Sequence, residues 1–198
     1  MNKMDKNWTL FLDRDGVINR RLLDDYVKSW AEFVFLPGVP EAIASFSERF
    51  GRIVVVTNQQ GIGKGLMTES DLHSIHHQMV LDIQKAGGRI DKVYFCPHHR
   101  QDNCACRKPR IGMAKQAKAD FPEIDWRRSI MVGDTPSDIE FGRNAGMRTV
   151  FVSAHEHAPP HADLQVASLA AFKDYIIKTL ALWSFRIIIR SEERRVGK

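Results

Sequence analysis

The chain has 198 residues, of which 43% are hydrophobic and 27% charged, and its formal net charge is +5 at pH 7. These proportions are typical of one soluble globular domain, and no apolar run approaches the roughly 20 residues that a membrane-spanning helix needs. Much of the positive charge lies in residues 184–198, so the rest is nearly neutral and fits a small anionic ligand at least as well as a nucleic acid.

Short apolar runs alternate with amphipathic segments from the N-terminus onward. The first thirteen residues contain no apolar stretch of signal-peptide length, which predicts a cytoplasmic location. Five continuous runs are typical of strands covered on both faces: residues 8–13, 52–58, 92–97, 128–134 and 148–153. Helical patterns occupy residues 38–50, 68–88, 112–121, 136–145 and 166–183. The alternation predicts a three-layer α/β sandwich around a mostly parallel, Rossmann-like sheet.

The pattern changes abruptly after residue 183. Beyond this point an isoleucine triplet stands between two arginines, and a mixed charged run follows. We therefore expect one domain over residues 1–183. For residues 184–198 we expect a disordered tail or an end that does not belong to the native protein, and we assign this tail no function.

Polar side chains follow several of the predicted strands, where ligands gather in parallel sheets. Asp13 and Asp15 are two positions apart on an extended backbone, so we expect their side chains to point the same way. Two neighbouring carboxylates repel each other unless a cation lies between them. Asp134 supplies a third oxygen ligand at another strand end, and this set suits Mg²⁺. Asp138, one turn later, is expected to hold a metal-bound water.

The glycine-rich segment NQQGIGKG, residues 58–65, follows the second predicted strand. It fails the Walker pattern, because Asn58 stands where the first glycine belongs and Gly65 where a serine or threonine belongs. It also fails the dinucleotide pattern, because Leu66 replaces the third glycine. We interpret the segment as a mobile loop over the substrate.

All three cysteines, Cys96, Cys104 and Cys106, lie within eleven positions, beside His98 and His99. In a cytosolic chain such a cluster favours metal binding over disulfides. Three thiolates and one imidazole form a closed tetrahedral zinc set, which leaves no position for water and indicates a structural metal.

A nucleic-acid-binding zinc finger is the alternative interpretation of this cluster. Such a finger needs a helix with base-reading side chains after the ligands. Here Pro109 disfavours a helix at Lys108. We therefore expect the zinc loop to be a clamp that orients Arg107 and Lys108 towards a phosphate.

Four segments in chain order, FLDRDGVIN, VVVTNQQG, CRKP and GDTPSD, resemble the four motifs of the haloacid-dehalogenase phosphohydrolases. The resemblance covers about residues 8–183. It is strongest to the small histidinol-phosphate and heptose-bisphosphate phosphatases, and it implies their fold without a large cap domain.

The resemblance implies a role for each acidic residue. Asp13 would attack phosphorus to form an aspartyl-phosphate, and Asp15 would protonate the leaving oxygen and later activate water. The carboxylates of Asp13 and Asp134, with the backbone carbonyl of Asp15, would hold Mg²⁺.

The resemblance also implies the remaining site residues. The Thr57 hydroxyl and the Asn58 backbone N–H would bind the phosphoryl oxygens, and Lys108 would balance their charge. The expected substrate contacts are Asn58, Gln59, Gln60, Arg107, Lys108 and Tyr26. The implied zinc ligands are Cys96, His98, Cys104 and Cys106, since the family's spacing favours His98 over His99.

The substrate signals are mixed. The short interval between His98 and Cys104 resembles the histidinol-phosphatase loop, whereas TNQQGIGKGLMTE and CRKPRIGM resemble the heptose enzymes. Thr135 stands where relatives often carry a basic residue, and the Arg20–Arg21 pair could compensate for it. The resemblance implies a Mg²⁺-dependent sugar-phosphate phosphatase that removes the 7-phosphate of D-glycero-D-manno-heptose 1,7-bisphosphate. We expect the protein to be a monomer. Histidinol phosphate is the first alternative, the 3′-phosphate end of DNA the second, and a zinc-binding module without activity the last.

Overall fold

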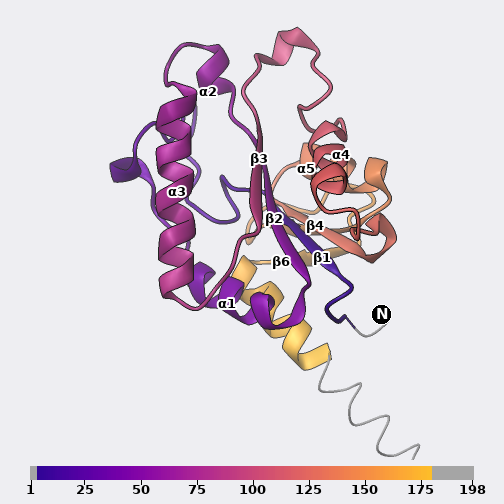
Figure 1. Ribbon diagram of the computed structural model, residues 1–198. Helices are drawn as coiled ribbons and strands as arrows, with labels where there is room; N and C mark the ends of the chain where they lie inside the picture. Colours follow the sequence, from indigo (N-terminus) through magenta and orange to yellow (C-terminus); the bar gives the residue numbers. More distant parts are fainter. Residues whose placement is uncertain (1–3, 180–198) are drawn as a thin grey trace, which may run out of the picture.

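The computed structural model describes residues 4–179 (Figure 1), so the predicted tail and the end of the last predicted helix lie outside the described residues. Its centre is a six-stranded parallel sheet in the order β3-β2-β1-β4-β5-β6. This is the strand order of doubly wound α/β folds. The strands are β1 (Thr9–Leu12), β2 (Arg52–Asn58), β3 (Lys92–Cys96), β4 (Ser129–Gly133), β5 (Arg148–Val152) and β6 (Leu164–Val166).

The first five strands coincide with the five predicted runs, whereas β6 was not predicted. It is a three-residue edge strand paired only with β5, and all three of its residues are partly or fully exposed. So short and open a strand leaves no continuous apolar run in the sequence.

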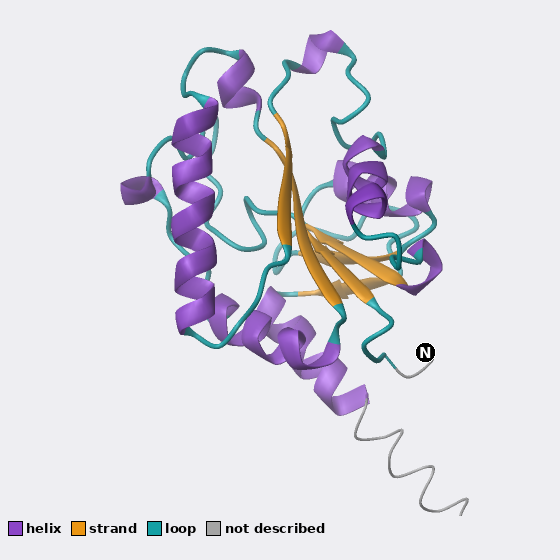
Figure 2. Ribbon diagram, in the orientation of Figure 1, coloured by secondary structure: helices purple, strands orange, loops and turns teal. Residues whose placement is uncertain are grey.

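Helices cover both faces of the sheet, as Figures 1 and 2 show. They are α1 (Val39–Arg49), α2 (Gln60–Gly63), α3 (Glu69–Lys85), α4 (Gly112–Asp120) and α5 (Pro136–Ala145), with a last helix over residues 169–179. Short 3-10 helices are η1 (Trp30–Glu32), η2 (Arg100–Asp102) and η3 (Trp126–Arg128).

Alternate residues of strand β1 belong to two separate hydrophobic cores, one on each face of the sheet. Leu10 and Leu12 of β1 pack with α1, α3 and the last helix, whereas Phe11 packs on the opposite face with α4 and α5. All three are fully buried, which explains why β1 reads as an unbroken apolar run rather than an alternating one. The predicted three-layer α/β sandwich is confirmed.

The glycine-rich segment differs from the mobile loop that we expected. Residues Gln60–Gly63 form the short helix α2, and the N–H of Gly63 donates to the carbonyl of Pro97 at 2.9 Å. A Cβ on Gly63 would come within 2.8 Å of that oxygen and 2.9 Å of the His99 nitrogen. The segment is therefore packed against the zinc loop, and Gly63 permits this close approach.

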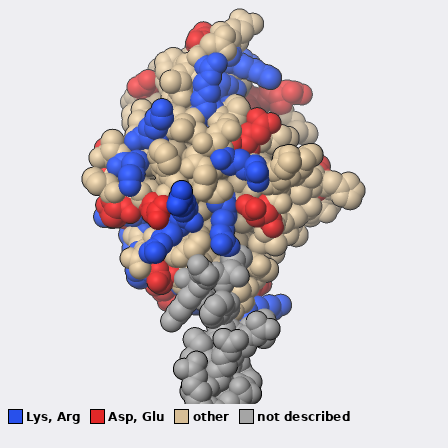
Figure 3. All heavy atoms as spheres, turned by 90° about the vertical axis from the view of Figure 1, so that its right-hand side faces the viewer, with Lys and Arg blue, Asp and Glu red and all other residues tan. Residues whose placement is uncertain are grey.

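The surface over α4 and α5 mixes basic and acidic side chains (Figure 3). A nucleic-acid-binding face would instead gather lysines and arginines in a patch or stripe. Within residues 4–179, no helix combines the length and apolar character needed to cross a membrane.

Candidate active site

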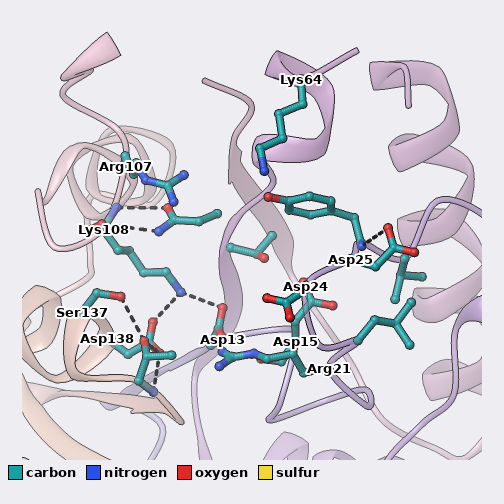
Figure 4. A pocket seen from close by; sticks show the side chains of 16 residues that line it. Asp13, Asp15, Arg21, Asp24, Asp25, Lys64, Arg107, Lys108, Ser137 and Asp138 are labelled. Carbon is teal, nitrogen blue, oxygen red and sulfur yellow. Dashed lines mark hydrogen bonds and ion pairs between the residues drawn. The ribbon is translucent and has the colours of Figure 1, made fainter. Parts of the chain in front are cut away.

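The carboxyl ends of three adjacent strands converge on one cavity of about 410 Å³ (Figure 4). Asp13 follows β1, Thr57 lies at the end of β2, and Asp138 lies in the first turn of α5, which follows β4. Lys108 reaches the same cavity from the segment after the zinc loop. Residues from four distant parts of the sequence therefore face one another, as the strand-end argument predicts.

Lys108 joins two buried carboxylates at the base of this cavity. Its Nζ lies 2.6 Å from Asp13 Oδ1 and 2.6 Å from Asp138 Oδ1, and it donates to the Val56 carbonyl at 2.8 Å. Burial disfavours the charged amine, but Asp13 and Asp138 outweigh burial and raise the pKa of Lys108. The ammonium is thus held in its charged form beside the proposed nucleophile.

Asp13, Asp134 and Asp138 form an acidic cluster whose ligand oxygens lie within 4.8 Å of one another. Burial and the nearby Asp138 raise the pKa of Asp13 to about 6, although Lys108 opposes the shift. Burial and Asp13 raise the pKa of Asp134 to about 8. Carboxylates that repel one another in this way favour a bound cation, and hard oxygen donors fit Mg²⁺.

Asp15 lines the same cavity as Asp13 but makes a separate set of contacts. Strand β1 ends at Leu12, so the alternation of an extended strand does not reach Asp15, and its carboxylate is not part of the acidic cluster. It accepts hydrogen bonds from Arg14 at 2.9 and 3.0 Å, from Asn19 at 2.9 Å and from Gln59 at 2.8 Å. Burial alone would raise the pKa of Asp15, but Arg14 and these donors lower it.

Gly16 lets the chain turn away directly after the two aspartates. Its φ is +97°, a conformation that side-chain-bearing residues rarely adopt. A Cβ at this position would lie 1.8 Å from Asp134 Oδ2. The glycine therefore serves both the turn and the close approach of Asp134.

The structure contains a buried pair behind the site, Arg14 and His76, that was not predicted from the sequence. Arg14 is fully buried, and its Nη1 lies 3.1 Å from Nε2 of His76, which is 5% exposed. Burial and the Arg14 charge lower the pKa of His76 to about 3, so the neutral ring accepts the hydrogen bond. His76 falls between Ile75 and Met79 on the buried face of α3, which is the signal that could have identified it.

Replacing His76 with leucine should destabilise the protein by about 1–3 kcal/mol at pH 7.5, because Arg14 Nη1 loses a buried partner. Because the folded-state pKa of His76 is about 3, the ring takes up a proton at a higher pH in the unfolded chain than in the folded protein. Its stabilisation is therefore present above about pH 6.5 and is lost as the pH falls. The difference in the free energy of unfolding between wild type and His76→Leu should therefore narrow as the pH falls from 6.5 to 5, by up to about 1.4 kcal/mol per pH unit.

Urea denaturation at several pH values measures this difference. His77→Leu on the exposed side of the same helix is the matched control. A difference that stays constant from pH 7.5 to 5 would show that His76 is not held neutral by Arg14.

The six expected substrate contacts divide into two groups. Tyr26, Asn58, Arg107 and Lys108 line the cavity, whereas Gln59 and Gln60 do not. Gln59 is fully buried, and its Nε2 donates to both Asp15 and Thr57 at 2.8 Å. This amide positions two site residues from behind and does not face the cavity.

Gln60 and Asn58 also act through their neighbours. The Gln60 amide donates to Tyr26 Oη at 3.3 Å and accepts from the Arg100 N–H at 2.8 Å, which links the cavity wall to the zinc loop. The Asn58 side chain accepts from the Lys108 N–H at 3.1 Å and donates to its carbonyl at 3.4 Å. Asn58 thereby fixes the backbone that carries Lys108.

Six further polar residues that were not among the expected site residues line the cavity: Arg21, Asp24, Asp25, Lys64, Thr135 and Ser137. Lys64 follows α2 and lies over the Tyr26 ring, with Nζ 5.2 Å from the ring centroid. Its place in the glycine-rich segment was the available signal. The tertiary structure was needed to show which side of that segment faces the cavity.

The structure brings Cys96, His98, Cys104 and Cys106 together, with one ligand atom of each within 4.8 Å of the others. The sulfur atoms are 3.2–3.4 Å apart, and His98 Nδ1 is 3.2 Å from Cys106 Sγ. Three thiols and one imidazole that converge in this way are the donor set of a closed tetrahedral zinc site, so this set fits zinc.

His99, the competing imidazole, has another role. Its Nδ1 accepts a hydrogen bond from the Gln101 N–H at 3.4 Å, and its own N–H donates to Asp102 at 2.8 Å. It therefore caps the 3-10 helix η2 within the loop. This geometry favours His98 as the fourth ligand.

Comparisons with known proteins agree with this geometry. The model of the HAD-hydrolase-like family matches residues 105–181. The D-glycero-α-D-manno-heptose-1,7-bisphosphate 7-phosphatase of Mycobacterium tuberculosis is 45% identical over 137 residues, which cover 69% of this chain and 72% of the relative. The β-anomer 7-phosphatase of Neisseria meningitidis is 34% identical over 178 residues, which cover 85% and 94%.

A solved structure is similar over nearly its whole length. The D,D-heptose 1,7-bisphosphate phosphatase from B. bronchiseptica, crystallised with magnesium and phosphate, superimposes with a TM-score of 0.79. It is 31% identical, and the match covers 87% of this chain and 99% of that one.

Proposed function

This chain belongs to the haloacid-dehalogenase-like phosphatases, in the family of the heptose-bisphosphate phosphatases, and from this premise we propose that it removes the 7-phosphate of D-glycero-D-manno-heptose 1,7-bisphosphate. The observation that carries this proposal is the distribution of charge around the cavity. A buried nucleophile and ammonium lie at its base, while Arg21, Lys64 and Arg107 lie around its walls. A substrate with two phosphates uses both sets of groups.

Asp13 is the proposed nucleophile. It lies at the base of the cavity, only 5% exposed, with one oxygen on Lys108. Attack on phosphorus forms the aspartyl-phosphate, and the bond from phosphorus to the sugar oxygen breaks. Lys108 and the Thr57 hydroxyl face the transferred group and offset its developing negative charge.

Asp15 is the proposed general acid and base. Arg14, Asn19 and Gln59 orient its carboxyl, and it lines the same cavity as Asp13. Because these donors favour the ionised carboxyl, Asp15 must first take up a proton from water before it delivers one to the departing sugar oxygen. It then accepts a proton from the water that hydrolyses the aspartyl-phosphate.

Asp13, Asp134 and the backbone carbonyl of Asp15 are the proposed magnesium ligands, with Asp138 behind them. When bound, Mg²⁺ neutralises the carboxylates and polarises the phosphoryl group. In this chain, the backbone of Thr135 and its hydroxyl donate to Asp138 at 3.0 and 2.5 Å, which holds that carboxylate at the start of α5.

Arg107 is proposed to recognise the part of the substrate that is not hydrolysed. Its Nη1 is buried and has no hydrogen-bond partner within the described residues, so an anionic oxygen from the substrate would satisfy it. The guanidinium fork suits a phosphate or a pair of sugar hydroxyls. The zinc ligand Cys106 precedes Arg107 directly and restrains its backbone.

Phosphate release should be measured in parallel from both anomers of the heptose 1,7-bisphosphate, from histidinol phosphate and from a 3′-phosphorylated oligonucleotide. We expect kcat/KM for a heptose bisphosphate to exceed the other substrates by at least about 100-fold, or about 2.7 kcal/mol of transition-state discrimination. Both anomers are needed because relatives are named for each.

A preference for histidinol phosphate would overturn the proposed substrate while keeping the phosphatase chemistry. A preference for the oligonucleotide would contradict the small-molecule assignment, which the mixed surface charge over α4 and α5 supports. The monomeric state and the cytoplasmic location stay predictions.

A further inference from the structure

Arg21 contacts two of the oxygens proposed to bind the metal. One of its nitrogens, Nη2, lies 2.8 Å from Asp134 Oδ1 and 3.1 Å from the Asp15 carbonyl oxygen. A single nitrogen that bridges both oxygens occupies the space where they converge. Figure 4 shows the arginine beside Asp13 and Asp15 at the edge of the cavity.

The Arg21 contact and a bound divalent cation exclude each other. Magnesium binds its oxygen ligands at about 2.0–2.1 Å, so an ion shared by Asp134 and the Asp15 carbonyl would lie within the space that this guanidinium nitrogen fills. The guanidinium cannot lose its charge to relieve the repulsion. Metal binding must therefore displace Arg21.

The displaced side chain has room to move. Its side chain is 39% exposed, whereas that of Asp134 beneath it is 14% exposed. Arg21 lines the cavity, and its guanidinium contacts the Asp134 carboxylate at 2.8 Å. The segment that carries it is open, since Leu23 is 88% exposed.

A movable cation is useful here because the residue that follows Asp134 is uncharged. Thr135 lines the cavity and carries no charge. The fixed ammonium of Lys108 is already committed to Asp13 and Asp138. Arg21 already lines the cavity with Arg107 and Lys64, and its release from Asp134 would free its charge for an anionic group of the substrate.

We propose that Arg21 is a metal-displaced clamp, which covers the magnesium ligands in the metal-free protein and, once released, binds the phosphate that the enzyme does not hydrolyse. The competition between Arg21 and metal rests only on the contacts of Arg21 with Asp134 and with the Asp15 carbonyl. The binding of the second phosphate by Arg21 rests on the proposed function.

Calorimetric titration of the zinc-loaded protein with Mg²⁺, without substrate, tests the competition. Arg21→Ala should bind Mg²⁺ at least about fivefold more tightly than wild type, the lower end of typical coupling between sites. Arg20→Ala is the matched control, because it removes the neighbouring exposed positive charge, which makes no contact with the acidic cluster. Its Mg²⁺ affinity should change less than about twofold if only the contacts matter.

An unchanged or weaker Mg²⁺ affinity in Arg21→Ala would overturn the competition, whatever the substrate is. An equal gain in Arg20→Ala would assign the effect to net charge and would also overturn it. The zinc content and the thermal midpoint of each variant establish that the fold is intact.

The second role of Arg21, binding of the phosphate that is not hydrolysed, is tested at saturating Mg²⁺. The measured quantity is the ratio of kcat/KM for heptose 1,7-bisphosphate to kcat/KM for heptose 7-phosphate. Arg21→Ala should lower this ratio by about tenfold, since only one of the two substrates carries the second phosphate. An unchanged ratio would mean that the released arginine finds another partner, such as Asp24 at the same cavity, and would overturn the clamp. Failure of the wild type to hydrolyse either heptose would instead contradict the proposed substrate, while the calorimetry still decides the competition.

Discussion

Asp13→Asn should lower kcat by at least about 10⁴-fold, because an amide cannot form the aspartyl-phosphate and only binding and positioning remain. The substitution preserves the shape of the side chain. It also leaves Asp138 as a carboxylate partner for Lys108, so the base of the cavity keeps an ion pair. We therefore expect the variant to fold and to retain zinc while it loses turnover.

The measurement combines phosphate release, zinc content and far-ultraviolet circular dichroism. Asp82→Asn on α3, a partly exposed residue paired with Lys85, is the matched control and should keep wild-type activity. A variant Asp13→Asn that retained more than about a tenth of the activity would show that another group forms the covalent bond.

Cys106→Ser should release zinc and lower the thermal midpoint by about 10 °C. Binding of a structural zinc contributes about 10–16 kcal/mol in small peptides, and even about 3 kcal/mol of lost stability shifts a chain of this size by that much. Activity should also fall, because Arg107 and Lys108 follow the lost ligand directly and line the cavity. Treatment of the wild type with a strong chelator should give the same loss of stability.

The matched variant for this prediction is His99→Gln. His99 caps η2 and is not one of the four residues of the cluster, so one zinc per chain should remain bound. If Cys106→Ser retained stoichiometric zinc and an unchanged midpoint, the cluster would not be a structural metal site. If His99→Gln lost zinc, the assignment of His98 as the fourth ligand would be wrong.

The sequence was informative wherever a residue's role follows from its place at the end of a continuous strand. Asp13 and Thr57 belong to runs that are buried on both faces, so the topology of a parallel sheet brings them to one edge. The sequence was less informative about side-chain orientation at residues that lie beyond the end of a strand. Asp15 lies past the end of β1, and its orientation depends on donors from Arg14, Asn19 and Gln59 that no local pattern reveals.

Short elements and close approaches were also invisible in the sequence. Strand β6 has three partly or fully exposed residues, and α2 contains two glycines that weaken any helical signal. Gly61 lies against Tyr26 and Met67, and Gly63 against the zinc loop. Gly63 has to lie close to Pro97 and His99, which is a tertiary requirement.

The amino-acid sequence by itself determined the layered α/β fold, the acidic and basic residues at the strand ends, and the cluster of three cysteines and neighbouring histidines. These features depend on periodicity and spacing along the chain, which local physics translates directly into structure. Only the tertiary structure decided that Gln59 works from behind the site, that His76 supports Arg14, and that Arg21 covers the proposed magnesium ligands. Each of the last three is a contact between groups from different elements, and its geometry is set by how the elements pack.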